Sequence, residues 1–511
     1  MDRRYAGHAT HVPHGSGIRG LTNQSIDSGE GRFGRLFDRP HAEFPQSALA
    51  ALADKMKGDG EVKDGADPEE SDIPAAYTYL GQFIDHDLTF DPSTFAQQKH
   101  DATAIRDFRT PRFDLDNLYG RGPADQPYLY DGIKLLLGDK LQIAARNPLA
   151  RDLPRAGSNS LGIRRAIIGD PRNDENVIVS QLHGLFLRFH NRVVDLNPNM
   201  AFDDVAREVR WHYQWLVLHD FLPRIIDPAI LAKISPAFAD PARSFKDDNG
   251  PHLSLKKVRE GLDFMPVEFS VAAYRLGHSM VRPGYRLNEF TKPLPIFDPS
   301  NPVGGLNSFG EFPRSWTIDW QRYIDLGLRP GAETDTDRVQ RAYRLDTSLV
   351  EPLSMLPISV AGDEATQKPH LRSLAFRNLL RGVELRLPSG QEVARHMQET
   401  PLTDQQILIG AAETGNSEQT DATPIDKVDA AFSNKAPLWV YVLAEARHNF
   451  FSPLKRAVLG PVGGRIVAEV FLGLMLADDN SYPKQKPDWK PSLGSNGNFG
   501  LPDLIREAFK V

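Results

Sequence analysis

Apolar residues recur at helical spacing through most of this chain, and that pattern limits the fold more than any other feature. The spacing predicts helices over residues 179–196, 203–226, 267–281, 371–386, 391–397, 403–410, 438–449 and 464–477. Alternating apolar and polar residues, which mark strands, are scarce, and residues 383–387 are one of few candidates. No segment of about 20–50 residues repeats, which argues against a solenoid. The sequence therefore predicts a mainly α protein with few short strands.

The domain organisation follows from length and from the distribution of loops. The chain has 511 residues, enough for one large domain or up to about three smaller ones. Loops rich in Pro and Gly are spread evenly, so no linker separates independent units. We expect a single large helical domain over residues 46–511, preceded by an extended arm over residues 1–45. Within the arm, His8, His11 and His14 fit a loose surface segment better than a metal site.

Composition excludes several classes of function. The formal charge is -7 and Lys and Arg are scattered, so a nucleic-acid partner is not expected. The absence of cysteine excludes disulfides, thiolate haem ligands, iron–sulfur clusters and cysteine nucleophiles. No apolar run is long enough to span a bilayer, and the first residues lack the apolar core of a secretory signal. We therefore expect a cytoplasmic protein, or one exported by a route other than the general secretory pathway.

Residues 77–90 contain the densest group of chemically active side chains. Gln82, Asp85 and His86 stand at positions i, i+3 and i+4, so one face of a helix presents an amide, a carboxylate and an imidazole together. Asp87 is turned by about 100° from His86 and can serve a different site. Standing alone, this group is more typical of a structural histidine with two solvated aspartates.

A second polar stretch, residues 169–176, precedes the predicted helix at 179. It contains Arg172 and Glu175, and on its own it fits a capping loop with acidic residues near the positive end of the helix dipole. The following helix contains His183 and His190, seven residues apart on one face. We expect these two histidines to pack and hydrogen bond inside the helical bundle.

A third stretch contains Gly277 beside His278. The glycine thins one face of the expected helix, so a flat group can approach the imidazole closely. Haem is such a group, and histidine is its usual fifth ligand in peroxidases and globins. A ligating histidine needs its other ring nitrogen fixed by an acceptor, which the carbonyl of Asn378 can supply. One turn later Arg381 can hold a haem propionate.

Together these stretches resemble the animal-type haem peroxidases, the myeloperoxidase-like branch of the peroxidase–cyclooxygenase superfamily, and most of all their bacterial members. The matching segments fall in the family's order over roughly residues 70–400; they are 81–87, 110–120, Arg172 with Glu175, 183–192, 275–278 and 378–388. The resemblance implies a helical domain enclosing a b-type haem. It also implies an enzyme that reduces hydrogen peroxide through ferryl intermediates and oxidises small donors such as phenols, bromide, iodide or thiocyanate.

The resemblance assigns roles on both sides of the haem. His86 is similar to the distal histidine that takes a proton from hydrogen peroxide and returns it to the leaving oxygen. Arg172 resembles the distal arginine that stabilises negative charge as the O–O bond breaks. Gln82 resembles the distal glutamine that orders water or a halide. On the other side, His278 resembles the iron ligand, with Asn378 accepting its Nδ1–H.

Further residues are implied as contacts of the haem periphery. Asp85 and Glu175 match the two carboxylates that form ester bonds to haem methyl groups in the mammalian enzymes. Arg275 and Arg381 match positions at the haem-binding surface. The family's third covalent link uses a methionine where this chain has Asn176, so that link should be absent and the strongest halide oxidation is not expected.

The resemblance also implies a calcium site. Asp87, Thr110, Arg112 through its backbone carbonyl, Asp114 and Asp116 match the family's ligands, and hard oxygen donors from a tight loop suit calcium. Asp116 stands where the mammalian enzymes have serine, which adds negative charge. The ion would tie the loop to the residue beside His86.

Two other functions remain open. The fatty-acid oxygenases of the same superfamily place a radical-forming tyrosine three residues before the proximal histidine. Here that position is Arg275, and Tyr274 is one residue away. The second alternative is a non-catalytic, calcium-dependent scaffold that keeps only the fold.

Overall fold

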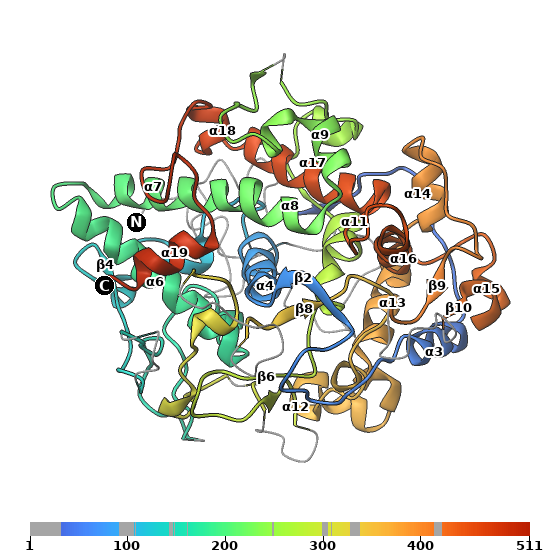
Figure 1. Ribbon diagram of the computed structural model, residues 1–511, viewed down its shortest axis with the longest axis horizontal. Helices are drawn as coiled ribbons and strands as arrows, with labels where there is room; N and C mark the ends of the chain where they lie inside the picture. Colours follow the sequence, from blue (N-terminus) through green and yellow to red (C-terminus); the bar gives the residue numbers. More distant parts are fainter. Residues whose placement is uncertain are drawn as a thin grey trace, which may run out of the picture.

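The computed structural model describes residues 32–90, 107, 109–142, 147, 149–160, 162–247, 250–298, 305–307, 309–327, 338–412 and 422–511. His8, His11 and His14 lie outside the described residues. Within the described part the protein is mainly helical, as predicted, and the strands are short (Figure 1).

The regular elements are spread along the described chain. The α-helices are α3 (Gln46–Lys55), α4 (Ala76–Leu88), α5 (Asp116–Tyr119), α6 (Val177–Leu196), α7 (Phe202–Leu216), α8 (Leu222–Ile225), α9 (Pro228–Ile234), α10 (Lys256–Arg259), α11 (Val267–Ser270), α12 (Ile358–Ala361), α13 (Leu374–Glu384), α14 (Gly390–His396), α15 (Ile425–Val428), α16 (Leu438–Phe451), α17 (Pro461–Ala477), α18 (Tyr482–Gln485) and α19 (Leu501–Ala508). The strands form two-stranded pairs: β1 (Phe33–Gly34) with β5 (Met265–Pro266) in parallel, and in antiparallel β2 (Glu70–Pro74) with β8 (Arg341–Tyr343), β3 (Tyr130–Asp131) with β4 (Lys134–Leu135), β6 (Gly284–Tyr285) with β7 (Leu294–Pro295), and β9 (Leu408–Ile409) with β10 (Thr423–Pro424).

Helix α4 lies near the middle of the molecule, with other helices around it (Figure 1). It packs against α6 and against two 3₁₀ helices, η4 (Pro171–Asp174) and η8 (Ala273–His278). The apolar faces of these elements join one continuous core that includes buried residues from Phe33 to Ala508. Because α4 is buried on nearly every side, its polar residues must face either a cavity or buried partners.

Most predicted helices are confirmed with small changes at their ends. Residues 179–196, 438–449 and 464–477 correspond to α6, α16 and α17. Residues 203–226 form α7, then a π-helical turn, η5 (Val217–Phe221), then α8. The predicted helices at 371–386 and 391–397 correspond to α13 and α14, the first starting three residues later.

Three local predictions are wrong. Residues 267–281 are not one helix: α11 ends at Ser270, the backbone departs from helical geometry at Ala272, and η8 follows. Residues 403–410 form a turn, in which the Gln406 and Ile407 amides donate to Thr403, and then strand β9. The strand expected at 383–387 is instead the last two residues of α13 and the turn that follows it, in which Arg386 takes a left-handed conformation with φ of 51°.

The described part of the N-terminal segment lies on the helical body. Strand β1 pairs with β5, and the buried carboxylate of Glu268 accepts hydrogen bonds from the backbone of Leu36 and Phe37. The boundary between an arm and a domain at residue 45 stays a prediction. None of the helices in the described ranges has the length and apolar character needed to cross a membrane.

Candidate active site

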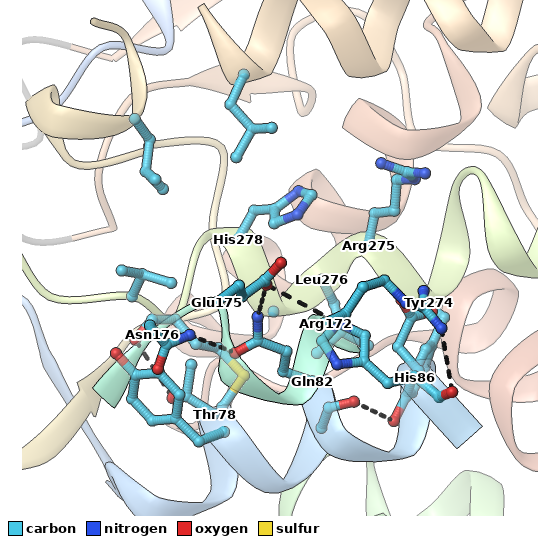
Figure 2. A pocket seen from close by; sticks show the side chains of 18 of the residues that line it. Thr78, Gln82, His86, Arg172, Glu175, Asn176, Tyr274, Arg275, Leu276 and His278 are labelled. Carbon is cyan, nitrogen blue, oxygen red and sulfur yellow. Dashed lines mark hydrogen bonds and ion pairs between the residues drawn. The ribbon is translucent and has the colours of Figure 1, made fainter. Parts of the chain in front are cut away.

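A cavity of about 590 Å³ lies between α4 and η4 on one side and η8 and α13 on the other. His86 and His278, 192 positions apart in the chain, both line it. Figure 2 shows His278 on one side, with Gln82, His86 and Arg172 gathered on the other. The volume is that of a site for a sizeable organic ligand rather than for a single ion.

The helical spacing in α4 orients its polar residues as predicted. Gln82, Asp85 and His86 line the cavity, whereas Asp87 is absent from the lining and lies fully buried beside another group of carboxylates. One turn of helix therefore serves two different sites.

The ring orientation of His86 is fixed by a residue that the sequence analysis missed. The Nδ1 atom of His86 lies 2.8 Å from the side-chain oxygen of Asn173, which can only accept, so His86 carries its proton on Nδ1. The lone pair on Nε2 is then available to a ligand in the cavity. The Asn173 amide nitrogen lies 3.0 Å from Nδ1 of His183, whose Nε2 is buried without a hydrogen-bond partner among the described residues. His183 thus belongs to a His–Asn–His chain rather than only to the packing of α6.

Burial keeps His86 neutral. Desolvation and the nearby charge of Arg172 lower the pKa of His86 to about 3. His86 is therefore neutral over the whole neutral pH range, with Nε2 unprotonated.

Arg172 reaches the cavity from η4. One of its terminal nitrogens donates to the backbone carbonyls of His86 (3.1 Å) and Thr89 (2.6 Å), and also to the carboxylate of Asp170 at 2.8 Å. These contacts anchor a fixed positive charge next to the C-terminal end of α4. Arg172 and the neighbouring Arg109 hold the pKa of Asp170 far below its usual range, so the pairs stay charged.

His278 is held by a different arrangement. Its Nδ1 lies 2.8 Å from Asn378, as predicted, but the nearer atom is the amide nitrogen. The amide oxygen instead accepts from Arg275 at 2.9 Å. The expected hydrogen bond from His278 Nδ1–H to the Asn378 oxygen is therefore absent in this structure, because Arg275 competes for the only acceptor. Burial and the charge of Arg275 lower the pKa of His278 to about 3.

Carboxylates and amides complete the distal wall. Glu175 accepts a hydrogen bond from Gln82, and its carboxylate lies 3.8 Å from Nε2 of His86. Burial raises the pKa of Glu175 to about 7 and also raises the pKa of Asp85. Asn176 lines the cavity, donates to Gln82 at 3.2 Å and caps the first turn of α6.

Three other residues contribute to the proximal wall. Arg381 lines the cavity from α13, and its role in holding an anion stays a prediction. Tyr274 also lines it, and its hydroxyl donates to the Gly81 carbonyl at 3.2 Å. A Cβ atom added to Gly277 would meet nothing within 4 Å, so the cavity is open beside His278.

The acidic residues expected at a calcium site do meet. Carboxylate oxygens of Asp87, Asp114 and Asp116 lie within 4.8 Å of one another, and the Thr110 hydroxyl donates to Asp114 at 2.7 Å. Among the residues that the structure describes, both oxygens of Asp87 and one of Asp116 are buried without hydrogen-bond partners. Carboxylate oxygens without such partners suit a hard cation. We call these three carboxylates the acidic cluster.

The extra charge of Asp116 does not act alone. Its other oxygen accepts from Arg109 at 2.9 Å, and Arg109 is completely buried. Part of the added negative charge is therefore already neutralised. Arg109 was not among the predicted site residues.

Comparison with known proteins finds one family match over part of the chain. The family model for animal haem peroxidase matches residues 107–303, a segment that contains the acidic loop, Arg172, Glu175 and His278 but not α4. Myeloperoxidase from Mus musculus is 27% identical over 172 residues, which is 32% of this chain and 21% of the relative. A peroxidase-like protein from Margaritifera margaritifera is 34% identical over 122 residues, 22% of this chain and 14% of the relative. The matches thus span about a fifth or less of these curated relatives.

Solved structures align over nearly the whole chain. Peroxidase A from Dictyostelium discoideum aligns with a TM-score of 0.57 and 15% identity, covering 93% of this chain and 95% of its own. A fatty acid alpha-dioxygenase from Arabidopsis thaliana aligns with a TM-score of 0.56 and 16% identity, covering 94% and 78%. The chain shares their fold. At these identities the likeness concerns the fold alone.

Proposed function

We propose that the protein is a haem peroxidase, of the bacterial type within the animal haem peroxidase family. The observation that carries this proposal is that two histidines from distant elements line one cavity, each with Nδ1 contacted by an asparagine. That arrangement leaves Nε2 of both rings for a ligand between them. Two buried structural histidines would not need a shared cavity.

The residues of the cavity fit a b-type haem. His278 would bind the iron through Nε2, Arg275 and Arg381 would pair with the propionates, and the space beside Gly277 suits a flat ring. Asp85 and Glu175 line the same cavity and are the candidates for ester links. A bound haem would supply the iron that cleaves the peroxide O–O bond and holds the oxidising equivalents.

Binding a metal through Nε2 requires His278 to carry its proton on Nδ1, facing an acceptor. Asn378 provides that acceptor if its side-chain amide rotates, so that the oxygen rather than the nitrogen faces Nδ1 of His278. This rotation becomes favourable when Arg275 releases the amide oxygen and pairs with an anionic group such as a propionate. We therefore expect Arg275 and Asn378 to rearrange when haem binds.

On the distal side the chain's own residues handle the proton and the charge. The free Nε2 of His86 accepts a proton from hydrogen peroxide and returns it to the departing oxygen, while Asn173 keeps the ring in the required tautomer. The fixed charge of Arg172 stabilises the negative charge that develops during cleavage. Gln82 helps to order water or a small anion in the same space.

A calcium ion in the acidic cluster is part of the proposal. Asp87, Asp114 and Asp116 would supply carboxylate oxygens, with Thr110 and the carbonyl of Arg112 completing the set. The ion would neutralise the buried charge beside His86 and hold the loop against α4.

Small electron donors are the proposed second substrates: phenols, and among anions bromide, iodide or thiocyanate. A panel of these donors, assayed under steady-state conditions with hydrogen peroxide, identifies the preferred class. Acidified organic solvent should fail to extract haem from peroxide-treated protein if ester links form at Asp85 and Glu175.

The decisive experiment is reconstitution with haem, followed by spectroscopy and rapid mixing with hydrogen peroxide. We expect a Soret band that changes within milliseconds to seconds of adding peroxide. No Soret band would favour the scaffold alternative. Rapid oxygen uptake with polyunsaturated fatty acid would favour the oxygenase. In the sequence, the tyrosine nearest to the position of the radical-forming residue is Tyr274, whose hydroxyl donates to the Gly81 carbonyl.

A further inference from the structure

Four charged side chains alternate in sign between the acidic cluster and the cavity: Asp116, Arg109, Asp170 and Arg172. Arg109 donates from Nη1 to Asp116 at 2.9 Å and from Nε to Asp170 at 3.0 Å. Arg172 donates to the same Asp170 oxygen, Oδ2, at 2.8 Å. The chain of contacts is unbroken from a cluster carboxylate to the arginine at the cavity.

Arg109 is suited to connect the two ends because it is 0% exposed and contacts two carboxylates at once. A guanidinium is a planar fork that holds two anions in fixed directions. In a buried setting such charged contacts are poorly screened, so a change at one carboxylate is felt at the other.

A hydrogen bond anchors the backbone of Arg109, so we assign the response to its side chain. Asp107 accepts hydrogen bonds from the backbone amides of Phe90 (2.8 Å) and Arg109 (3.1 Å), which ties this loop to the end of α4. The Phe90 ring lies near both guanidinium groups, 5.8 Å from Arg109 and 4.6 Å from Arg172.

We propose that Arg109 is a positioning residue that couples cation binding in the acidic cluster to the placement of Arg172, through Asp170. A divalent cation competes with Arg109 for Asp116. When the cation binds, Arg109 shifts its interaction toward Asp170 and changes how that carboxylate holds Arg172. The inference rests on the proposed function for the cation and for Arg172, but it requires no haem.

The coupling is reciprocal, so it can be measured from the cation alone. Isothermal titration with Ca²⁺ would be performed on the wild-type chain, Arg172→Gln, Arg109→Gln and the double variant. When Arg172 is removed, Asp170 can interact with Arg109 alone, and Arg109 then binds Asp116 less tightly. The Ca²⁺ affinity should therefore rise by about fivefold or more. In the Arg109→Gln background the same Arg172 substitution should change Ca²⁺ affinity by less than about twofold.

The opposing result is an equal Arg172 effect in both backgrounds. It would mean that the two sites communicate through space or through α4, and would overturn the role of Arg109. A wild-type chain that binds no Ca²⁺ would overturn it as well. By contrast, a missing Soret band after haem reconstitution contradicts only the proposed peroxidase function.

Two further variants guard against misfolding. Arg338→Gln removes another buried arginine, which pairs with Glu70, and should leave both the Ca²⁺ affinity and its response to Arg172→Gln unchanged. If Arg109→Gln does not fold, Asp170→Asn interrupts the chain at its centre with a side chain of the same shape. It too should abolish the Arg172 effect, and a preserved effect there overturns the proposal.

Discussion

The two histidines of the cavity are held in contrasting ways. His86 lies on a regular helix, and its partner Asn173 is itself held by His183, so both contacts of Asn173 are made inside the protein. His278 lies at the end of the short, irregular η8, and its partner Asn378 has its oxygen engaged by Arg275.

The difference indicates which side is built in advance and which responds to a ligand. The distal side already has the histidine tautomer that proton transfer needs and a fixed positive charge that can stabilise developing negative charge. The proximal side has the right residues, but their hydrogen bonds must exchange before His278 can bind a metal. Substitutions on the two sides should therefore fail in different ways.

The largest effect is expected from His278→Ala. Without the imidazole the cavity loses the proposed iron ligand, so reconstituted protein should lose the Soret band on gel filtration. The exposed His448 supplies a matched control, since His448→Ala should keep the band at full intensity. Stable haem retention by His278→Ala would contradict the assignment of the iron ligand.

His86→Ala should leave haem bound and slow the reaction with peroxide. Loss of a positioned general base typically costs about 10²- to 10⁴-fold, and we expect a decrease of about 10³-fold in the second-order rate constant. Stopped-flow measurement of the Soret change gives this rate. A decrease of less than about tenfold would mean that a group other than His86 handles the proton, and Glu175 is the nearest candidate.

A comparison of Asn173→Ala with Asn378→Ala separates the two sides directly. Without Asn173, the proton of His86 is no longer held on Nδ1. The peroxide reaction should then slow by about 10- to 100-fold, while the haem affinity stays unchanged. Loss of Asn378 removes the acceptor for His278 and should weaken haem affinity by a similar factor. Haem titration and stopped-flow rates measure both quantities in each variant. If the two variants behave alike, the contrast between preformed and responsive sides is wrong.

The parts of the site that could be predicted from sequence are those set by local periodicity. The positions of Gln82, Asp85 and His86 on one face of α4, and of Asp87 on another, follow from 3.6 residues per turn. Residues 267–281 mark the limit of the same reasoning. Their spacing predicts a helix, but the chain breaks at Ala272, where tertiary packing overrides the local preference.

The unpredicted parts depend on partners that sequence spacing does not reveal. Asn173 looks like an ordinary loop residue until the fold brings His86 and His183 to its two ends. The orientation of the Asn378 amide is decided by Arg275, 103 positions earlier. A usable signal for Arg109 was the additional Asp116, because an extra buried carboxylate calls for a compensating cation nearby.

The smallest effect concerns pH, and it sharpens the contrast on the distal side. With a pKa of about 3, His86 stays neutral down to about pH 4, so it should not titrate near 6.5. Glu175, with a pKa of about 7 and 3.8 Å away, should titrate instead. Its negative charge above pH 7 makes His86 a stronger base, so the peroxide rate of freshly reconstituted protein should fall by a few-fold, on the order of 2–5, as pH drops through 7. In Glu175→Gln the profile should be flat from pH 8 to 5. A step near 6.5 that persists in this variant would mean that His86 itself gains the proton, and that its burial does not keep it neutral.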